Sequence, residues 1–334
     1  MFYEPRIMRH LKTIIKAVIS IVLFSYLVYT SDQARIVEIL GNIYKLNGIL
    51  YLSLAVIAGL LSIFLMTIRW QIILKQYDQH FSLKTLFEFY LIGLFFNNFL
   101  PTSIGGDIIR IYKVVGDNED RTAGFASVIL ERVLGIASTL FLAITSLYYV
   151  SHYFEDDRIL YTSVILFCMI VGFFILVTRK KPFEFLLSLF DKFTLLKIGE
   201  KITKLIEAFY FLKEKRKVFI WVFVLSFFSQ ALIVLMNYAI VLAMDIEVDL
   251  MYLFLVVPVT FMLTMLPSIN GVGIRDGGYV FMLAKVGVSR AAAISLSFMN
   301  VLIPMVISLW GAVLFFTQRK KITMSEVEAI EKNF

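Results

Sequence analysis

The chain has 334 residues, 60% of them hydrophobic, with a formal net charge of +7 and a mean hydropathy of +0.84. Soluble domains contain roughly 50% apolar residues, so this composition excludes an ordinary soluble domain and predicts an all-α integral membrane protein. The positive charge does not indicate nucleic-acid binding, because Lys and Arg gather at the ends of apolar runs, as they do in the cytoplasmic flanks of membrane spans.

Several apolar runs are long enough to cross a bilayer as helices, which takes about 20 residues. In chain order they cover residues 11–29, 48–68, 122–150, 159–178, 218–243 and 291–317. The second run ends at Arg69 and Trp70, which we expect to anchor the span at the membrane interface. Basic residues before the first run, without a small-residue cleavage pattern, predict an uncleaved first span.

Two further apolar segments, 83–115 and 251–283, are each interrupted by proline and glycine. The residues of the two breaks are Pro101, Gly105, Gly106, Pro267, Gly271 and Gly273. Because the arm of residues 103–115 is only about 20 Å long, we expect it to return to the side it came from. The sequence therefore predicts re-entrant helical hairpins, with breaks at 97–115 and 263–283.

The charges between the spans predict the topology. Residues 179–217 are the most basic part of the chain, which places them and both termini in the cytoplasm of a multi-pass protein of the cell (inner) membrane. Their apolar spacing suits amphipathic helices on the inner leaflet, or equally a linker helix that packs on the protein itself.

Each half of the chain then contains two full spans, a hairpin and another full span. We expect one repeat over 1–150, a second over 151–321, and a polar tail over 322–334. The charged flanks open the first hairpin to the inside and the second to the outside, so the predicted fold is two inverted repeats with about six full spans. Paired breaks of this kind mark the binding site of a secondary transporter.

Charged and amide side chains within the apolar segments form the candidate substrate site. They are Arg110, Arg275, Glu131, Arg132, Asp107, Asn98 and Asn270. An arginine at membrane depth costs about 3 kcal/mol or more unless a partner or water compensates it. A guanidinium binds phosphate bidentately, and helix N-termini after the breaks would add N–H donors. These features predict an anion site near the midplane of the membrane.

Structural roles for the same residues stay open. Arg110 can instead pair with Asp107 or extend to the interface, and Glu131 with Arg132 can form a buried salt bridge between helices. Interhelical hydrogen bonding is the default role of asparagines inside spans. The lone Cys168, the scattered histidines and the lack of a phosphate-binding loop or nucleophile motif lead us to expect no cofactor, no metal site and no enzymatic activity.

Three motifs together resemble a known family. They are N-N-x-L-P-T-S-I-G-G-D-x-x-R at 97–110, E-R-V-L-G at 131–135 and L-P-S-I-N-G-V-G-I-R-D-G at 266–277. The pattern resembles the flippase-like transmembrane region of lysylphosphatidylglycerol synthase over roughly residues 10–317. The resemblance implies a helical lipid-translocating fold. Because no soluble domain follows the last span in this sequence, we expect no lipid aminoacylation.

We therefore expect a lipid flippase or scramblase-type transporter that moves an anionic phospholipid, polyprenyl-phosphate or glycolipid head group between leaflets. The alternative is an integral membrane enzyme or accessory subunit in the synthesis of glycolipids or lipid-linked sugars. The expected partners are a membrane lipid with an anionic head group and a lipid-synthesis enzyme.

Overall fold

The computed structural model describes residues 18, 20–99, 105–116, 122–150, 215–266 and 271–317, and every regular element within these ranges is helical. The elements are α2 (Gln33–Gly41), the 3-10 turn η1 (Asn42–Tyr44), α3 (Leu46–Lys75), α4 (Leu83–Phe99), α5 (Gly105–Val115), α6 (Thr122–Val150), α10 (Arg216–Ala243), α11 (Leu250–Leu263), α12 (Ile274–Ala284) and α13 (Arg290–Thr317). A further helix covers Ser20–Tyr29. The expected span at 159–178, the basic segment up to 214 and the polar tail lie outside the described residues.

Four of the described helices are long and apolar enough to cross a membrane: Asn47–Lys75, Gly124–Val150, Lys217–Ala243 and Arg290–Thr317. They confirm the predicted spans at 48–68, 122–150, 218–243 and 291–317. The first of these helices continues seven residues past its predicted end. The short helices α4, α5, α11 and α12 confirm that both broken segments are helical on either side of the break.

Local chemistry fixes several helix ends. Asp249 caps α11, because its Oδ1 accepts a hydrogen bond at 2.8 Å from the backbone N–H of Met251. Before α12, Gly271 and Gly273 adopt φ angles of 77° and 83°, which side chains with a Cβ rarely adopt. Asp276 then accepts a hydrogen bond from the backbone N–H of Gly273. The glycines therefore allow the chain to turn directly into α12.

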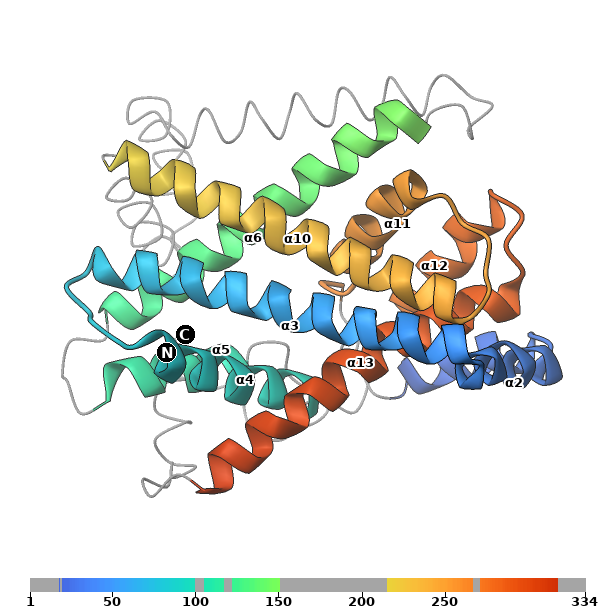
Figure 1. Cartoon of the computed structure of the whole chain (residues 1–334), viewed down its shortest axis with the longest axis horizontal. Helices are drawn as coiled ribbons and strands as arrows, with labels where there is room; N and C mark the ends of the chain where they lie inside the picture. Colours follow the sequence, from blue (N-terminus) through green and yellow to red (C-terminus); the bar gives the residue numbers. More distant parts are fainter. Residues whose placement is uncertain are drawn as a thin grey trace, which may run out of the picture.

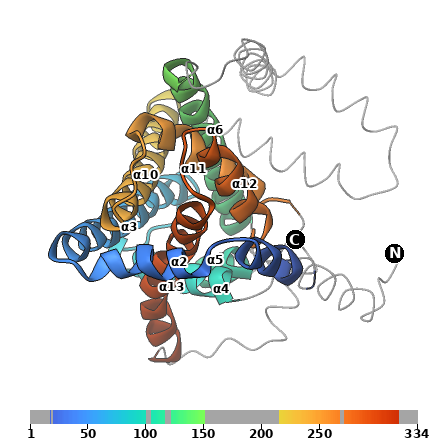
Figure 2. The same cartoon turned by 90° about the vertical axis from the view of Figure 1, so that its right-hand side faces the viewer.

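Helices from the two halves of the chain pack against one another. The long helices α3 and α10 lie side by side, α4 packs on α13, and α11 packs on α6 (Figure 1). Within each half, α4 contacts α5 and α11 contacts α12. Seen end-on, α13 passes between α3 and α10 on one side and α12 on the other (Figure 2).

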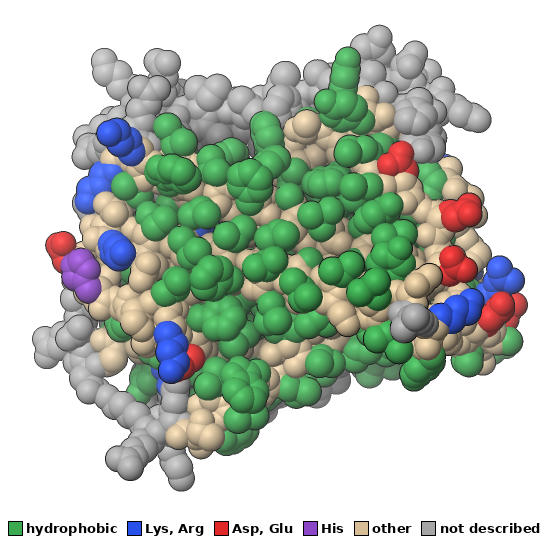
Figure 3. All heavy atoms as spheres, in the orientation of Figure 1, with side chains coloured by type: hydrophobic (Ala, Val, Ile, Leu, Met, Phe, Trp, Pro, Cys, Tyr) green, Lys and Arg blue, Asp and Glu red, His purple; other side chains and the backbone are tan. Residues whose placement is uncertain are grey.

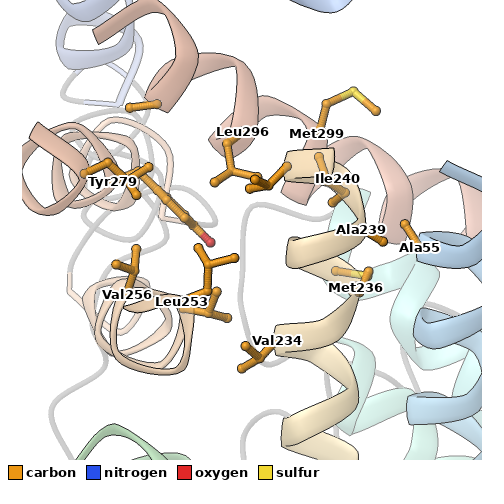
Figure 4. Packing of buried hydrophobic residues seen from close by; sticks show 14 of the residues in the cluster. Ala55, Val234, Met236, Ala239, Ile240, Leu253, Val256, Tyr279, Leu296 and Met299 are labelled. Carbon is orange, nitrogen blue, oxygen red and sulfur yellow. The ribbon is translucent and has the colours of Figure 1, made fainter. Parts of the chain in front are cut away.

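The main hydrophobic core lies where the helices of the second half meet. Leu253 and Val256 of α11 face the fully buried Tyr279 of α12, and Ile240 of α10 and Leu296 of α13 close the cluster (Figure 4). Tyr279 keeps its hydroxyl group satisfied by donating to Asn237 at 3.2 Å. This packing holds α12, and with it Arg275, against α10 and α13.

The outer surface has a broad hydrophobic band between two charged ends. Figure 3 shows most of the blue Lys and Arg side chains at the left-hand end, most of the red Asp and Glu side chains together with some blue ones at the right-hand end, and green side chains between the two ends. Large apolar side chains such as Trp221, Phe228 and Trp310 are exposed. A soluble protein rarely exposes so wide an apolar surface, which suits contact with lipid.

Candidate functional site: a buried arginine cluster

The carboxylate of Glu131 on α6 is buried and joins three other helices directly, and a fourth through Arg69. Its Oε1 accepts hydrogen bonds from Arg69 Nη2 of α3 at 2.8 Å and from the Tyr90 hydroxyl of α4 at 3.0 Å. Its Oε2 accepts from Arg110 Nη2 of α5. Arg69 also donates through Nη1 to Ser226 Oγ of α10 at 2.8 Å.

A second carboxylate, Asp107 on α5, extends the network. It accepts a hydrogen bond from Nε of Arg132, and its Oδ1 lies 3.7 Å from Nη1 of Arg110. Arg110 is 5% exposed, so it does not extend to the interface, whereas the Arg132 side chain is 44% exposed. The internal ion pair anticipated for Arg110 therefore forms, with both Asp107 and Glu131.

Two aromatic rings hold the Arg110 guanidinium in place. Its Cζ lies 4.1 Å from the centroid of the Trp70 ring and 4.0 Å from that of Tyr90. Cation–π contacts of this kind are worth about 2 kcal/mol when desolvated. Trp70 is itself fixed, because its indole N–H donates to Ser127 Oγ at 3.1 Å.

Close packing of α4 on α5 places Arg110 in the cluster. A Cβ at Gly93 would lie 2.7 Å from Cγ of Arg110, and a Cβ at Gly106 would lie 2.7 Å from Cγ of Asn97. The Asn97 side chain accepts a hydrogen bond from the backbone N–H of Gly106 at 2.8 Å, so it satisfies a donor at the start of α5. The glycines let the two arms approach, and Arg110 then lies along α4.

Arg69 and Arg110 carry more hydrogen-bond donors than their surroundings satisfy. Each guanidinium has five N–H donors, and the described residues accept three hydrogen bonds from the two side chains together. The Nε atoms of both are buried without a hydrogen-bond partner among the residues that the structure describes. Because each unsatisfied buried donor costs about 1–3 kcal/mol, the cluster favours a ligand rich in acceptor oxygens.

The cluster lines a cavity of about 290 Å³. Its charged lining residues are Arg69, Asp107, Arg110, Glu131 and Arg132. Much of the remaining wall is apolar, with Met66 and Met236 among its residues. Arg69 lies six residues before the end of α3, or about 9 Å inside it at 1.5 Å per residue. The charged cavity therefore lies within the apolar part of the fold.

Arg275 belongs to a separate group at the start of α12. Its Nη2 donates to Asp276 Oδ1 at 2.7 Å, and its Nε lies 3.2 Å from both Asp276 Oδ1 and Ser297 Oγ. Ser297, on α13, also donates to Asp276. The guanidinium and the carboxylate, both buried, thus neutralise each other locally.

Arg275 lines a second cavity, of about 190 Å³, beside the first. The two cavities share the lining residues Gln230, Ile233, Phe261, Asn300 and Pro304. Asn98 lines the second cavity and donates to the backbone oxygen of Pro304 at 3.2 Å and to Ser308 Oγ at 3.1 Å. Arg110 and Arg275 therefore lie in neighbouring cavities rather than in one.

The structure brings together four of the residues singled out from the sequence: Asp107, Arg110, Glu131 and Arg132. Gly105 and Gly106 begin α5, as expected of a helix break. Pro101, Pro267 and Asn270 lie outside the described residues. Among the residues described, His, Cys, Asp and Glu form no group of three that could hold a metal ion.

The prediction that Arg69 and Trp70 form an interfacial anchor is wrong. α3 continues to Lys75, and both side chains are buried, at 3% and 0% exposure, where they contact the cluster. Tyr90 was missed as well, because a tyrosine in an apolar run resembles the rest of the core. The sequence did hold a signal for Arg69: the next cation, Lys75, lies six residues further along the chain and suits the end of the helix better.

Comparison with known proteins places the chain among membrane proteins. Residues 13–311 match the family model described as the lysylphosphatidylglycerol synthase TM region. A UPF0104 membrane protein of Pyrococcus horikoshii is 25% identical over 298 residues, or 82% of this chain and 89% of that protein.

Two shorter similarities involve further UPF0104 membrane proteins. A UPF0104 membrane protein of Methanocaldococcus jannaschii is 34% identical over 93 residues, 27% of this chain and 28% of its own. One of Methanothermobacter thermautotrophicus is 27% identical over 129 residues, 37% of this chain and 38% of its own. No solved structure matches this one. The match of the family model to nearly the whole chain shows that this multi-pass membrane protein belongs to the lysylphosphatidylglycerol synthase TM-region family.

Proposed function

We propose that the protein moves a lipid with an anionic head group between membrane leaflets, as a flippase or scramblase-type transporter. The substrate class is an anionic phospholipid, a polyprenyl phosphate or a glycolipid. The observation that carries the proposal is the surplus of guanidinium donors beside a cavity of about 290 Å³ within apolar helices. A phosphate group would supply the acceptor oxygens that Arg69 and Arg110 lack.

The packing of the helices supports an inverted-repeat transporter. The helices α3, α4, α5 and α6 correspond in this order to α10, α11, α12 and α13. When each helix is replaced by its counterpart, every packed pair among these helices becomes another pair that packs in the structure. The pair α4–α13 becomes α11–α6, for example, and α5–α6 becomes α12–α13. This correspondence favours repeats over 1–150 and 151–321, with two re-entrant hairpins.

The directions of the helices favour opposite orientations for the two repeats. In Figure 1, α3 and α10 run in opposite directions, and the hairpins α4–α5 and α11–α12 enter from opposite ends. The basic end of Figure 3 is the end at which α3 finishes and α10 starts. By the positive-inside rule we place this end, and both chain termini, in the cytoplasm.

Reconstitution tests the function. The purified protein is placed in liposomes that contain a fluorescent anionic phospholipid. Movement of this lipid from the inner to the outer leaflet should make its fluorescence accessible to a membrane-impermeant quencher. Arg110→Gln should abolish this movement, because the variant removes a cationic anchor of the cavity, and the exposed Arg35→Gln on α2 should not. If folded protein moves no anionic lipid but converts one chemically, the alternative of a membrane enzyme replaces this proposal.

A further inference from the structure

The second cavity has a different chemistry from the first. Its polar wall is formed mainly by hydroxyl and amide side chains, such as Thr139, Gln230, Thr260, Thr264 and Asn300. Its one charged residue among those described, Arg275, is paired with Asp276. No carboxylate belongs to the described lining of this cavity. Its polar part is therefore effectively neutral.

The hydroxyl groups in this wall present oxygens that can still accept hydrogen bonds. Thr139 donates to the backbone oxygen of Gly135 at 2.8 Å, Thr260 to that of Val256 at 2.8 Å, and Thr264 to that of Phe261 at 2.7 Å. Since each proton is engaged within its own helix, the oxygen faces other groups as an acceptor. Such acceptors suit the hydroxyl groups of a ligand.

The proline inside α13 makes the wall still more polar. Pro304 and Asn300 both line the second cavity. A proline has no N–H group, so the carbonyl of Asn300, four residues before Pro304, loses its helical partner. Within a membrane such freed groups are tolerated where they line a polar cavity.

Gln230 connects the two cavities. Its side chain lines both of them, and its amide group forms no hydrogen bond with any described residue. A Cβ at Gly135 would lie 3.8 Å from Arg69 Nη1 and 4.0 Å from Gln230 Nε2, so the amide lies near the arginine cluster. Asn300, which also lines both, donates to Asn237 Oδ1 at 2.6 Å.

We propose that the two cavities form one bipartite head-group site. The charged cavity binds the phosphate, and the neutral cavity binds a hydroxyl-bearing group attached to that phosphate. Gln230 forms hydrogen bonds with the head group where the two cavities meet. The inference rests on the proposed lipid-moving function and narrows its substrate class to lipids with a phosphate-linked polyol or sugar.

The same geometry disfavours a head group that carries an amine. A carboxylate is the partner that best compensates the charge of a buried ammonium group, and both carboxylates of the charged cavity are engaged by arginines. The neutral cavity offers no carboxylate among its described residues. A lipid whose head-group glycerol carries an aminoacyl ester would therefore place its positive charge without a carboxylate counter-ion in an apolar protein, which is unfavourable.

Four lipids that differ only beyond the phosphate test the proposal in proteoliposomes: phosphatidic acid, phosphatidylglycerol, phosphatidylinositol and lysyl-phosphatidylglycerol. We expect phosphatidylinositol to move fastest and the lysyl lipid slowest. Gln230→Leu should reduce the preference for phosphatidylinositol over phosphatidic acid about tenfold, as expected when a buried hydrogen-bonding pair is broken. The exposed Gln33→Leu on α2 is the matched control and should keep the preference.

The outcomes separate the two proposals. Equal movement of the three anionic lipids, or fastest movement of the lysyl lipid, overturns the bipartite site and leaves the transport function standing. If no lipid moves, the transport function is overturned, and calorimetric binding of soluble glycerophosphoinositol and glycerol phosphate decides the site. Tighter, Gln230-dependent binding of glycerophosphoinositol supports the site, and equal binding of both overturns it.

Discussion

Replacement of Glu131 by glutamine perturbs the arginine cluster at its centre. The carboxylate is 2% exposed and accepts hydrogen bonds from Arg69, Arg110 and Tyr90. Glutamine has nearly the same size but turns one of the two acceptor oxygens into an NH2 donor. That donor would face another donor, a guanidinium or a phenol, while two buried guanidinium groups would lose their shared negative charge.

The size of the effect follows from these contacts. Removal of one partner from a buried ion pair costs about 3–5 kcal/mol, since the remaining charge is left uncompensated. The retained amide oxygen still accepts one hydrogen bond, but two charges are affected at once. We therefore expect Glu131→Gln to lower the free energy of unfolding by about 3–5 kcal/mol.

Unfolding in detergent micelles, followed by tryptophan fluorescence, measures this change. Trp70 reports on the cluster because its ring lies 4.1 Å from Arg110 Cζ. The exposed Glu38→Gln on α2 is the matched control, with an expected change within about 0.5 kcal/mol. The combination of Arg69→Gln with Glu131→Gln should cost less than the sum of the single changes, by about 1–3 kcal/mol. Equal stability of the Glu131 and Glu38 variants would refute the cluster as a buried charge network.

Three further predictions follow from the structure. Arg110→Lys should lower the free energy of unfolding by about 2 kcal/mol, because an ammonium group cannot keep both the planar ring contacts and the ion pair with Glu131; unchanged stability in the same fluorescence assay would contradict this. Gly106→Ala should destabilise the protein by about 1–3 kcal/mol, because the added methyl group would clash with Asn97 and the backbone of Gly93. Gly277→Ala has nothing within 4 Å of the added methyl group and should stabilise the protein by about 0.5–1 kcal/mol. Thermal unfolding measures both changes, and the opposite order would be evidence against the close α4–α5 packing. Single cysteines in place of His80 and Glu247, in a Cys168→Ser background, should react with an impermeant thiol reagent from opposite sides of the membrane, and reaction from one side alone would exclude the assigned topology.

The spans and the helix breaks could be predicted from the sequence because they depend on local properties. A run of apolar residues sets the length of a membrane helix, and the four long described helices match predicted spans. Closely spaced glycines after a proline favour the end of one helix and the start of another, so the starts of α5 at Gly105 and of α12 after Gly273 agreed with the predicted breaks. Glu131 and Arg110 were conspicuous as charges within apolar segments.

Only the tertiary structure determined which residues form the site. Arg69 was interpreted as an interfacial anchor, but packing of α3 against α6 and α10 buries it opposite a carboxylate 62 residues away. Arg110 and Arg275 occur in similar motifs, yet Arg275 pairs with Asp276 and lines its own cavity. A local pattern specifies where a helix begins and ends, whereas the face that it buries depends on the shape of a distant partner, such as Gly93 receiving Arg110. The sequence alone therefore identified the charged residues, and only the folded chain determined which of them share a cavity.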